Sequence, residues 1–458
     1  MVTIGLRDIL LYGLIFVSLP FCFFSPFFGG LVWTWISFMN PHRLAWGYAK
    51  YFLEPAMLVG GTTLLGFAVS KESKRLPNNF GTYALITLWA LMSISTLTAY
   101  NHVPAFQAWE DRTKMLLMAF VIIALTNTRE RLRTLFLVTA LSLGFYGVKG
   151  GIFAISTGGH YHVMGPVRSF IEDNNAMALA LNMTLPMLIY LSRDVEQRRL
   201  RLLLRATFVL SIFAIVSTQS RGGLLGLIAV ATLLFLKSGR KVTAAALVVG
   251  GTVAMLAFVP DTWTQRMGTI ETYNQEGSAV SRINAWKLAW RLALARPAFG
   301  WGPQAMEDKS LYDLYYPDSP TRHDVHSSYF QLLSESGFPI FFVWIALMLW
   351  TFVSLQGLSR RVRGSPDLRW MAVYADMLQV SLAAYAVSGM FLEMAYFDLV
   401  YHILGGAIVL NAMAAQLVPA RSPVLRRPVV ARPAAARIPA TVALALGGPS
   451  SVAKGRQA

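Results

Sequence analysis

The sequence predicts an all-α polytopic membrane protein with about twelve transmembrane helices and one large outer loop. Of its 458 residues, 55% are hydrophobic and only 14% are charged, which is too little charge to cover a soluble protein of this length. The apolar residues form continuous runs of about 20 residues, the length that a helix needs to cross a bilayer. Because these runs do not alternate polar and apolar residues, an outer-membrane barrel is not expected.

Twelve apolar runs are candidate transmembrane helices. The first, 9–39, is too long for one straight crossing and contains Pro20 and Pro26. It is expected to form either two short spans or one helix with a re-entrant or interfacial piece. No small-residue cleavage pattern follows its apolar stretch, so we expect an uncleaved helix and not a signal peptide. The runs lie at about residues 9–39, 51–70, 80–99, 113–127, 134–157, 174–192, 202–219, 222–237, 242–260, 338–357, 370–391 and 394–416.

Basic residues are concentrated in alternate loops. One set of segments holds 25 of the 40 Lys and Arg but 5 of the 23 Asp and Glu, whereas loop 261–337 has 7 basic and 9 acidic residues. The positive-inside rule therefore places the basic set in the cytoplasm and loops 100–112, 158–173 and 261–337 outside. With twelve crossings, both termini are expected in the cytoplasm, and the net charge of +17 reflects topology and not nucleic-acid binding. The basic set is 71–79, 129–133, 193–205, 237–241, 358–369 and 418–458.

Four parts follow from this pattern. Residues 1–260 form an N-terminal transmembrane bundle, 261–337 the outer loop, 338–417 the C-terminal transmembrane helices, and 418–458 a basic tail. The tail is rich in Pro, Ala and Arg without any acidic residue, which predicts a disordered cytoplasmic segment able to touch anionic lipid headgroups. The single cysteine, Cys22, cannot form a disulfide within the chain.

The outer loop contains an amphipathic helix that is expected to lie at the membrane surface. Residues 282–296 stop at Pro297, and their apolar side chains repeat at helical spacing on one side, away from the cationic ones. Trp together with cationic side chains suits the headgroup boundary. The apolar side carries Ile283, Trp286, Trp290 and Leu294, and the cations are Arg282, Lys287 and Arg291.

Two further elements complete the loop. Residues 299–303, Phe-Gly-Trp-Gly-Pro, cannot continue a helix and predict a tight turn. Residues 325–335 are expected to form a short helix that ends at Gly337 and presents His326, Tyr329 and Phe330 on one face.

Polar residues also begin two spans on the predicted outer face. In Ser-Thr-Gln-Ser-Arg-Gly-Gly (217–223), Arg221 stands where the helix dipole favours an anion, and two glycines would let a ligand approach the backbone. The alternative is an arginine that only extends towards water. Residues 172–175, Glu-Asp-Asn-Asn, are either part of the same polar site or simply an N-cap.

The histidines do not suggest a metal site. His323 and His326 are three residues apart, but they lack the His-Glu-x-x-His pattern of zinc proteases, so no metal and no cofactor are expected. All seven histidines fall on the predicted outer side. For His326 alone, the alternative to a functional role is an interfacial histidine hydrated by water.

Five motifs, in this order, resemble those of bacterial O-antigen ligases and the related Wzy-type polymerases. They are an Asn that opens a helix (Asn175), Ser-Thr-Gln-Ser-Arg-Gly (217–222), Arg-x-x-x-Trp (282–286), Phe-Gly-x-Gly (299–302) and His-Ser-x-Tyr…Glu-x-Gly (326–337). The resemblance covers about residues 160–345. Met-Asn-Pro-His-Arg (39–43) with Trp-Gly (46–47) further resembles the O-glycosylation ligases that accompany exosortase systems. In one departure, the family's acidic residue in the last outer stretch is matched cleanly by neither Glu393 nor Asp398.

The resemblance implies a metal-independent, inverting glycosyltransferase of the bacterial inner membrane with a periplasmic active face. Its donor would be a glycan on undecaprenyl diphosphate, and its acceptor a hydroxyl group of lipid A-core, another glycan or a protein. Permanently charged, bidentate arginines suit a diphosphate, and a histidine suits a base that works near neutral pH. The expected diphosphate ligands are Arg221, Arg282 and Arg168, with Lys149 weaker; the expected base is His326, supported by Asn175, Ser220, Tyr329 and Glu335.

Two other functions remain open. The motifs do not separate a ligase from a Wzy-type polymerase of lipid-linked repeat units, and only the N-terminal resemblance favours the ligase. A transporter of lipid-linked oligosaccharides would place ionisable residues in mid-span of broken, repeated helices. Here the nearest are Lys149, Arg205 and Asp376, no repeat is evident, and the polar motifs gather on one face, which favours an enzyme.

Overall fold

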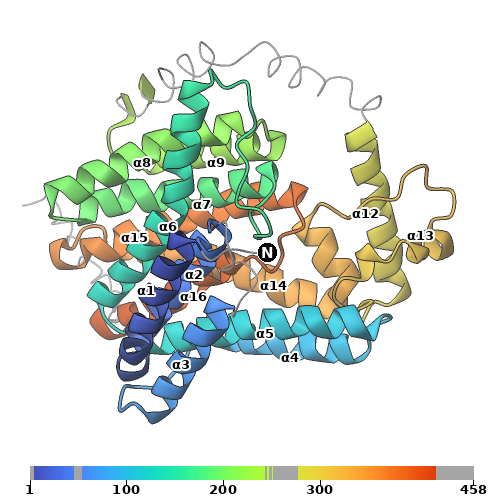
Figure 1. Ribbon diagram of the computed structural model, residues 1–458, viewed down its shortest axis with the longest axis horizontal. Helices are drawn as coiled ribbons and strands as arrows, with labels where there is room; N and C mark the ends of the chain where they lie inside the picture. The colour runs from blue at the N-terminus through green and yellow to red at the C-terminus, as the bar shows by residue number, and fades with distance from the viewer. Residues whose placement is uncertain (1–4, 46–53, 243–244, 247–249, 251–276, 419–458) are drawn as a thin grey trace, which may run out of the picture. The chain divides into compact units, whose positions relative to one another are not determined.

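The computed structural model describes residues 5–45, 54–242, 245–246, 250 and 277–418, and within them helices, joined by turns and irregular segments, are the regular secondary structure (Figure 1). Predicted span 242–260 lies almost wholly outside the described residues, as do residues 261–276 and the tail beyond Val418. The longer helices are α1 Leu6–Phe24, α2 Pro26–Met39, α3 Pro55–Val69, α4 Phe80–Leu97, α5 His102–Leu125, α6 Arg129–Ser156, α7 Asn174–Asp194, α8 Arg198–Ser217, α9 Arg221–Lys237, α12 Gly277–Ala295, α14 Ser328–Val362, α15 Arg369–Ser388 and α16 Asp398–Leu417.

Within the described ranges, eight helices are long and apolar enough to cross a membrane, and α3 is a shorter apolar helix. The count of about twelve is therefore supported only in part, although every predicted span that the structure describes coincides with helix. One boundary was wrong. The predicted outer loop 100–112 is helical, because α5 begins at His102 and carries its charged residues for several turns before its apolar part.

The first apolar run is two helices. α1 ends at Phe24, and Pro26 occupies the first turn of α2, where its missing N–H is not needed. The start of α1 lies beside residues 41–45 and 165–167, which line one cavity with it, while the end of α1 packs against the end of α3 at Gly66.

This pairing corrects the predicted topology. A cytoplasmic N-terminus and an outer loop 158–173 do not hold together, because Arg7 and Gly165 lie at the same end of the bundle. The sequence left open whether residues 9–39 cross once or twice. With two crossings, α1 begins on the side opposite to the one expected for a single crossing.

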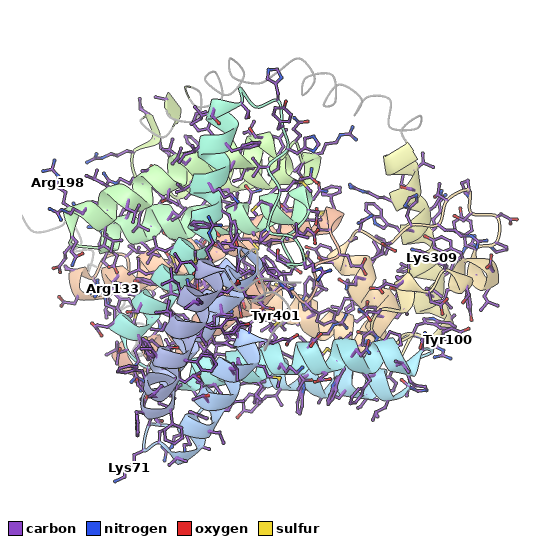
Figure 2. The ribbon with its side chains drawn as sticks, in the orientation of Figure 1. Lys71, Tyr100, Arg133, Arg198, Lys309 and Tyr401 are labelled. Atoms are coloured by element: carbon purple, nitrogen blue, oxygen red, sulfur yellow. The ribbon has the colours of Figure 1, made fainter. Side chains whose placement is uncertain are left out.

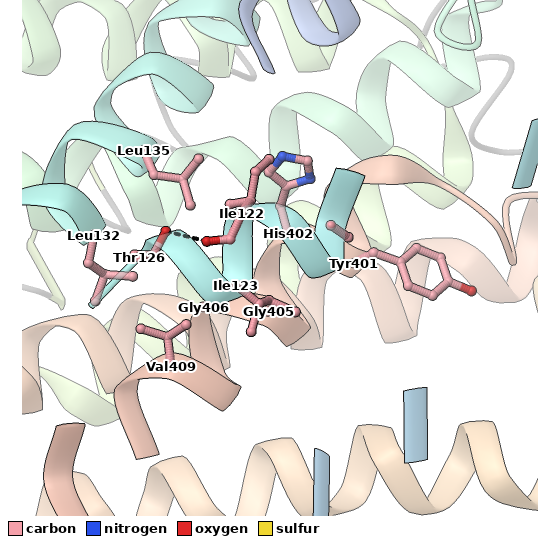
Figure 3. A pocket seen from close by; sticks show the side chains of 11 residues that line it. Ile122, Ile123, Thr126, Leu132, Leu135, Tyr401, His402, Gly405, Gly406 and Val409 are labelled. Atoms are coloured by element: carbon pink, nitrogen blue, oxygen red, sulfur yellow. Dashed lines mark hydrogen bonds between the residues drawn. The ribbon is translucent and has the colours of Figure 1, made fainter. Parts of the chain in front are cut away.

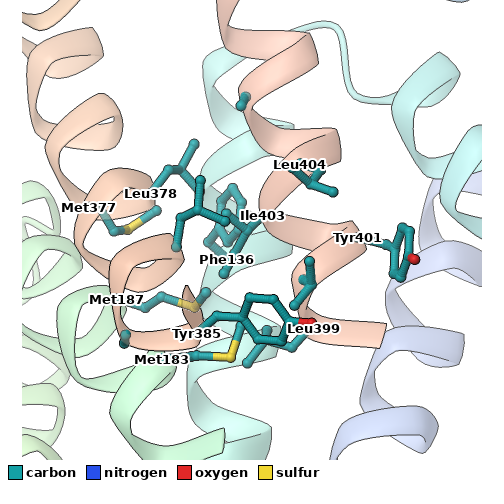
Figure 4. Close-up of a cluster of buried hydrophobic side chains, with 14 of the residues drawn as sticks. Phe136, Met183, Met187, Met377, Leu378, Tyr385, Leu399, Tyr401, Ile403 and Leu404 are labelled. Carbon is teal, nitrogen blue, oxygen red and sulfur yellow. The ribbon is translucent and has the colours of Figure 1, made fainter. Parts of the chain in front are cut away.

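The core lies where α7, α15 and α16 meet (Figure 4). Met183 and Met187 of α7 pack against Met377 of α15 and Leu399 of α16, all of them buried. The side chains that Figure 4 labels belong to one buried apolar cluster. The same cluster includes Val230 of α9 and Leu332 of α14, so α7, α9 and α14 are anchored in one core.

Residues from the two predicted sides of the membrane lie apart in the structure. Figure 2 shows Lys71, Arg133 and Arg198, from the segments predicted to be cytoplasmic, on the left, and Tyr100 and Lys309, from segments predicted outside, on the right. Which of these ends faces the cytoplasm stays a prediction from the charge pattern.

Asp376, the acidic residue of α15, is buried and forms ion pairs with two cations. Asp376 accepts from Lys237 at 2.7 Å and from Arg363 at 2.9 Å, and both cations come from the C-terminal ends of their helices. It thus forms a neutralised contact near a helix end and not an isolated charge in mid-span.

The outer loop folds into a small helical unit. The buried face of α12 carries Leu288, Ala289 and Leu292, which form a separate apolar cluster with α13 (Ser310–Tyr315) and Val325. Of the apolar side predicted from the sequence, Ile283, Trp290 and Leu294 remain exposed. An exposed apolar stripe on a helix with cations suits the membrane surface.

Candidate active site at the outer helix ends

His326 occupies an irregular segment directly before α14. Its backbone has φ +42°, in the left-handed region, and the helix begins only at Ser328. The expectation that His326, Tyr329 and Phe330 share a helical face is therefore wrong, because the chain turns sharply at His326 before entering the helix. The strained conformation directs this one side chain independently of the helix that follows it.

Trp286 fixes the approach to His326. Its indole Nε1 donates to the Val325 carbonyl at 2.9 Å, and its ring stacks on Phe330, with centroids 5.4 Å apart. Arg282 stands one turn earlier on α12, so it lies on the same side of that helix. The spacing in Arg-x-x-x-Trp thus has a structural reason: the Trp anchors the residue before the histidine while the Arg faces the same region.

The charges around His326 come from three segments. Burial lowers the pKa of His326, the Arg282 guanidinium lowers it further, and the carboxylates of Asp324 and Asp173 oppose them. Asp173 is the N-cap of α7, where its carboxylate accepts from the backbone N–H groups of Asn175 and Ala176. Charges from α12, from the segment before α14 and from the start of α7 thus act on one imidazole, and burial with Arg282 favours its neutral form.

The Asn175 and Ser220 motifs form one unit. The Ser220 hydroxyl donates to the Asn175 amide oxygen at 2.7 Å and accepts from the N–H of Gly223, so it caps α9 and ties it to α7. Asn174 donates to the Thr218 carbonyl at 2.8 Å. Arg221 is the first residue of α9 and is half-buried at this junction.

The two glycines after Arg221 serve packing. A Cβ on Gly223 would lie 2.5 Å from the Cβ of Ala178, and one on Gly222 would lie 3.3 Å from the Cβ of Phe391. The expectation that they admit a ligand is not supported, since neighbouring helices fill that space. They let α9 approach α7 and the segment after α15 closely.

Arg168 lies in an exposed turn with φ +62°. Its backbone N–H donates to the Glu172 carboxylate at 2.7 Å, which shapes the turn leading into α7. Its role at a diphosphate stays a prediction. Tyr329 has a different partner from the one expected, because its hydroxyl donates to the Ala386 carbonyl at 2.8 Å.

Glu335 forms a buried ion pair that the sequence analysis missed. Its Oε2 lies 3.0 Å from Nη2 of Arg112, and the two side chains are 1% and 10% exposed. Its Oε1 accepts from the Gln304 N–H at 2.9 Å. The guanidinium lies 3.6 Å from the centroid of the Tyr396 ring. Glu335 therefore joins α5, α14, the turn after α12 and the segment before α16, and does not contact His326.

The Phe-Gly-Trp-Gly turn (299–302) packs on the part of α14 that precedes Gly337. Trp301 and Gly302 donate from their N–H groups to the carbonyls of Ser334 and Glu335, at 3.1 and 2.8 Å. Gly337, with φ +78°, interrupts α14 as predicted, and its Cβ position would lie 2.7 Å from the Pro297 carbonyl oxygen. Two motifs distant in the sequence thus form one contact surface.

Glu393 is the second titratable group of this region. Burial, with the nearby carboxylate of Glu335, raises the pKa of Glu393 to about 8, and Arg112 opposes the shift. The side chain is therefore largely protonated at neutral pH. The segment that carries it is held by Ser328, whose hydroxyl donates to the Leu392 carbonyl at 2.8 Å.

A small void beside His402 is not a substrate site. Its volume is about 10 Å³, and apolar side chains such as Ile122 and Leu135 line it (Figure 3). His402 stacks on Trp33 with the rings 6.1 Å apart, and its Nδ1 lies 3.1 Å from the Asp398 carbonyl.

Two family models match the chain. Residues 206–345 match the model described as O-antigen ligase, and residues 6–196 match a family of unknown function. The first range contains Ser220, Arg221, Arg282, His326 and Glu335, and the second contains Arg112, Arg168, Asp173 and Asn175. None of the curated proteins matches the chain.

Proposed function

We propose that this chain, which belongs to the O-antigen ligase and Wzy-type polymerase superfamily, transfers a glycan from undecaprenyl diphosphate to a hydroxyl group. The acceptor is lipid A-core, another glycan or a protein, and transfer occurs at the periplasmic face of a bacterial inner membrane. The chemistry is metal-independent and inverts the anomeric centre.

The proposal rests chiefly on the neighbourhood of Arg282 and His326. A neutral imidazole can accept a proton, and burial with a nearby guanidinium keeps His326 neutral. The same guanidinium offers two parallel N–H donors to phosphate oxygens. A base for the acceptor and a cation for the leaving group therefore lie close enough to influence each other electrostatically.

The step is a single displacement. The acceptor hydroxyl gives its proton to a ring nitrogen of His326 while its oxygen attacks the anomeric carbon from the face opposite the leaving group. The bond between that carbon and the diphosphate oxygen breaks, and the oxygen keeps the electron pair. Arg282 and Arg221 stabilise the charge that develops on the diphosphate.

The lipid-borne donor, and an acceptor such as lipid A-core that is also lipid-borne, must enter from the bilayer. The exposed side chains of Ile283, Trp290 and Leu294 on α12 suit contact with the headgroup layer, close to the site. The ligase is preferred to the polymerase because of the N-terminal resemblance alone. Paired charges such as Asp376 give no specific support to transport.

The test uses purified protein in liposomes with a lipid-diphosphate glycan and an acceptor. His326→Ala should lose roughly 10²- to 10⁴-fold in transfer rate, the usual contribution of a general base. His323→Ala, at an exposed position, is the matched control and should be mild. EDTA should leave the wild type unaffected. Near-normal transfer by His326→Ala, or inactivation by EDTA that a divalent ion reverses, would contradict the mechanism.

The class of product distinguishes the alternatives. In a deletion strain, accumulation of long polymer on its lipid carrier indicates a ligase, and single repeat units indicate a polymerase. Build-up on the cytoplasmic face indicates a transporter and would overturn the proposal.

A further inference from the structure

A cavity of about 640 Å³ shares no lining residue with the site around His326, but Pro41 and Arg43 of the 39–43 motif line it, as does Lys149, the weaker diphosphate candidate. Four segments line it: the start of α1, residues 41–45 after α2, the outer part of α6, and residues 165–167. All four belong to the range that matches the family of unknown function. Its volume falls within the range of about 300–1,000 Å³ that is usual for small-molecule sites.

Three cations from three elements line this cavity, and none of its lining residues is acidic. They are Arg7, Arg43 and Lys149. Within the described ranges, neither Arg43 nor Lys149 forms an ion pair, and the Nε of Arg43 is buried without a hydrogen-bond partner. Arg43 and Lys149 thus bring two like charges to the cavity without an ion-pair partner among the described residues, which raises the free energy of the protein, and a bound anion removes that repulsion.

The geometry of the cations favours phosphate. Arginine offers a planar fork and lysine a mobile point charge, which together suit the several oxygens of a phosphate group. Burial and the Arg43 charge lower the pKa of His42, the residue before it, to about 4, so the imidazole adds no further charge at neutral pH. The cavity thus offers a phosphate both rigid guanidinium N–H donors and a mobile ammonium group.

Apolar side chains at the same cavity favour a phosphate that is attached to a lipid. Phe145 and Val167 line it and are 39% and 67% exposed. Leu10 and Leu14 of α1 are also exposed, in the helix that contributes Arg7. A cationic pocket beside exposed apolar residues is suited to a charged headgroup with its hydrocarbon chain in the bilayer.

We propose that this cavity binds the phosphate headgroup of a lipid, at a site separate from the one around His326. Val167 and Asp173 are six residues apart, so at most roughly 20 Å of extended chain separates the cavity from the start of α7. A lipid held here would present its attached group within reach of that site. Two sources share the chemistry, a polyprenyl diphosphate and an anionic phospholipid of the bilayer.

The experiment measures occupancy of the cavity and not transfer. A photoreactive benzoylphenylalanine replaces the exposed Val167 in the full chain, which is reconstituted in nanodiscs of neutral phosphatidylcholine. Labelled undecaprenyl diphosphate or labelled phosphatidylglycerol is then added, with or without unlabelled inorganic pyrophosphate as a competitor, and crosslinking is measured against concentration. Because no turnover is needed, the result does not depend on the proposed transferase activity.

The double variant Arg43→Gln/Lys149→Gln should weaken crosslinking of the lipid by roughly tenfold or more, as expected for losing two charge-assisted contacts. Lys114→Gln, which removes an exposed cation from α5, is the control and should change nothing. If Arg43→Gln disturbs folding, Lys149→Gln alone, at an exposed residue without an ion pair, should still reduce crosslinking severalfold.

Each outcome bears on the proposal. Charge-dependent crosslinking of undecaprenyl diphosphate supports it and identifies a substrate lipid, and charge-dependent crosslinking of phosphatidylglycerol alone supports it and identifies a bilayer lipid. Equal labelling of wild type and charge variants, or no labelling, overturns it.

Discussion

The ion pair between Arg112 and Glu335 should dominate the stability of the outer region. Arg112→Met removes the charge but keeps an apolar side chain of similar length, and it leaves the Glu335 carboxylate buried at 1% exposure without its partner. Removing one member of a buried pair typically costs about 3–5 kcal/mol, because the remaining charge is not solvated. The contact with the Tyr396 ring, 3.6 Å from the guanidinium carbon, is lost as well.

Lys114 provides a matched control on the same helix. It pairs with Glu110 at 2.7 Å, but both side chains are 50% exposed. Exposed pairs contribute about 0–1 kcal/mol, so Lys114→Met should be nearly neutral. The difference between two substitutions of a cation by Met on α5, only two positions apart, isolates the effect of burial.

The assay is unfolding of the purified protein in mixed micelles with increasing denaturing detergent, followed by tryptophan fluorescence. The double variant Arg112→Met/Glu335→Met should be more stable than Arg112→Met alone, because it no longer buries an unpaired carboxylate. If Arg112→Met is as stable as Lys114→Met, the pair does not act as described. The same conclusion follows if the double variant loses as much stability as the two single variants together.

Three further predictions concern the site and the topology. Arg221→Lys and Arg282→Lys should each lower the transfer rate about 30- to 1000-fold at matched abundance, because a point charge cannot replace the bidentate guanidinium; full activity in both would exclude them as diphosphate ligands. Because burial and Arg282 lower the pKa of His326, the transfer rate should decline only below pH 6.5 as the pH is lowered. Arg282→Gln should shift this decline to higher pH. If the decline does not shift, Arg282 does not act on the titration of His326. In a cysteine-free background, a cysteine in place of Leu6 should react with a membrane-impermeant maleimide added outside, and a cysteine in place of Arg361 should not. The reverse pattern would place the candidate site on the cytoplasmic side.

The pattern of helices could be predicted because it depends on local properties. An apolar run of bilayer length is enough to predict a spanning helix. Pro26 begins α2 and Gly337 interrupts α14 through their own backbone conformations. The tight turn at 299–303 was predictable for the same reason. The direction in which α1 runs depends on packing against α3 and residues 41–45, which are remote in sequence, so composition left it open.

The site could be predicted only as separate motifs. Arg112 pairs with a carboxylate 223 residues away, and in the sequence it is one charge among several at the start of an apolar run. A single charge ten residues into a helix carries no local signal of burial. The glycines after Arg221 illustrate the opposite error, since a flexible residue beside a cation suggested a ligand, and only the position of Ala178 reveals packing.

The two ranges that match different family models share one site. Ser220 in the first range donates to Asn175 in the second, and Glu335 in the first pairs with Arg112 in the second. The carboxylate of Asp173, also in the second range, acts on the pKa of His326. Without residues 6–196, the range 206–345 would keep a buried, uncompensated Glu335, and the Ser220 hydroxyl would lose its Asn175 acceptor. The region of unknown function therefore supplies the contacts that fix the motifs of the ligase region in place, and substitutions at Arg112 or Asn175 should reach the chemistry through the residues they hold.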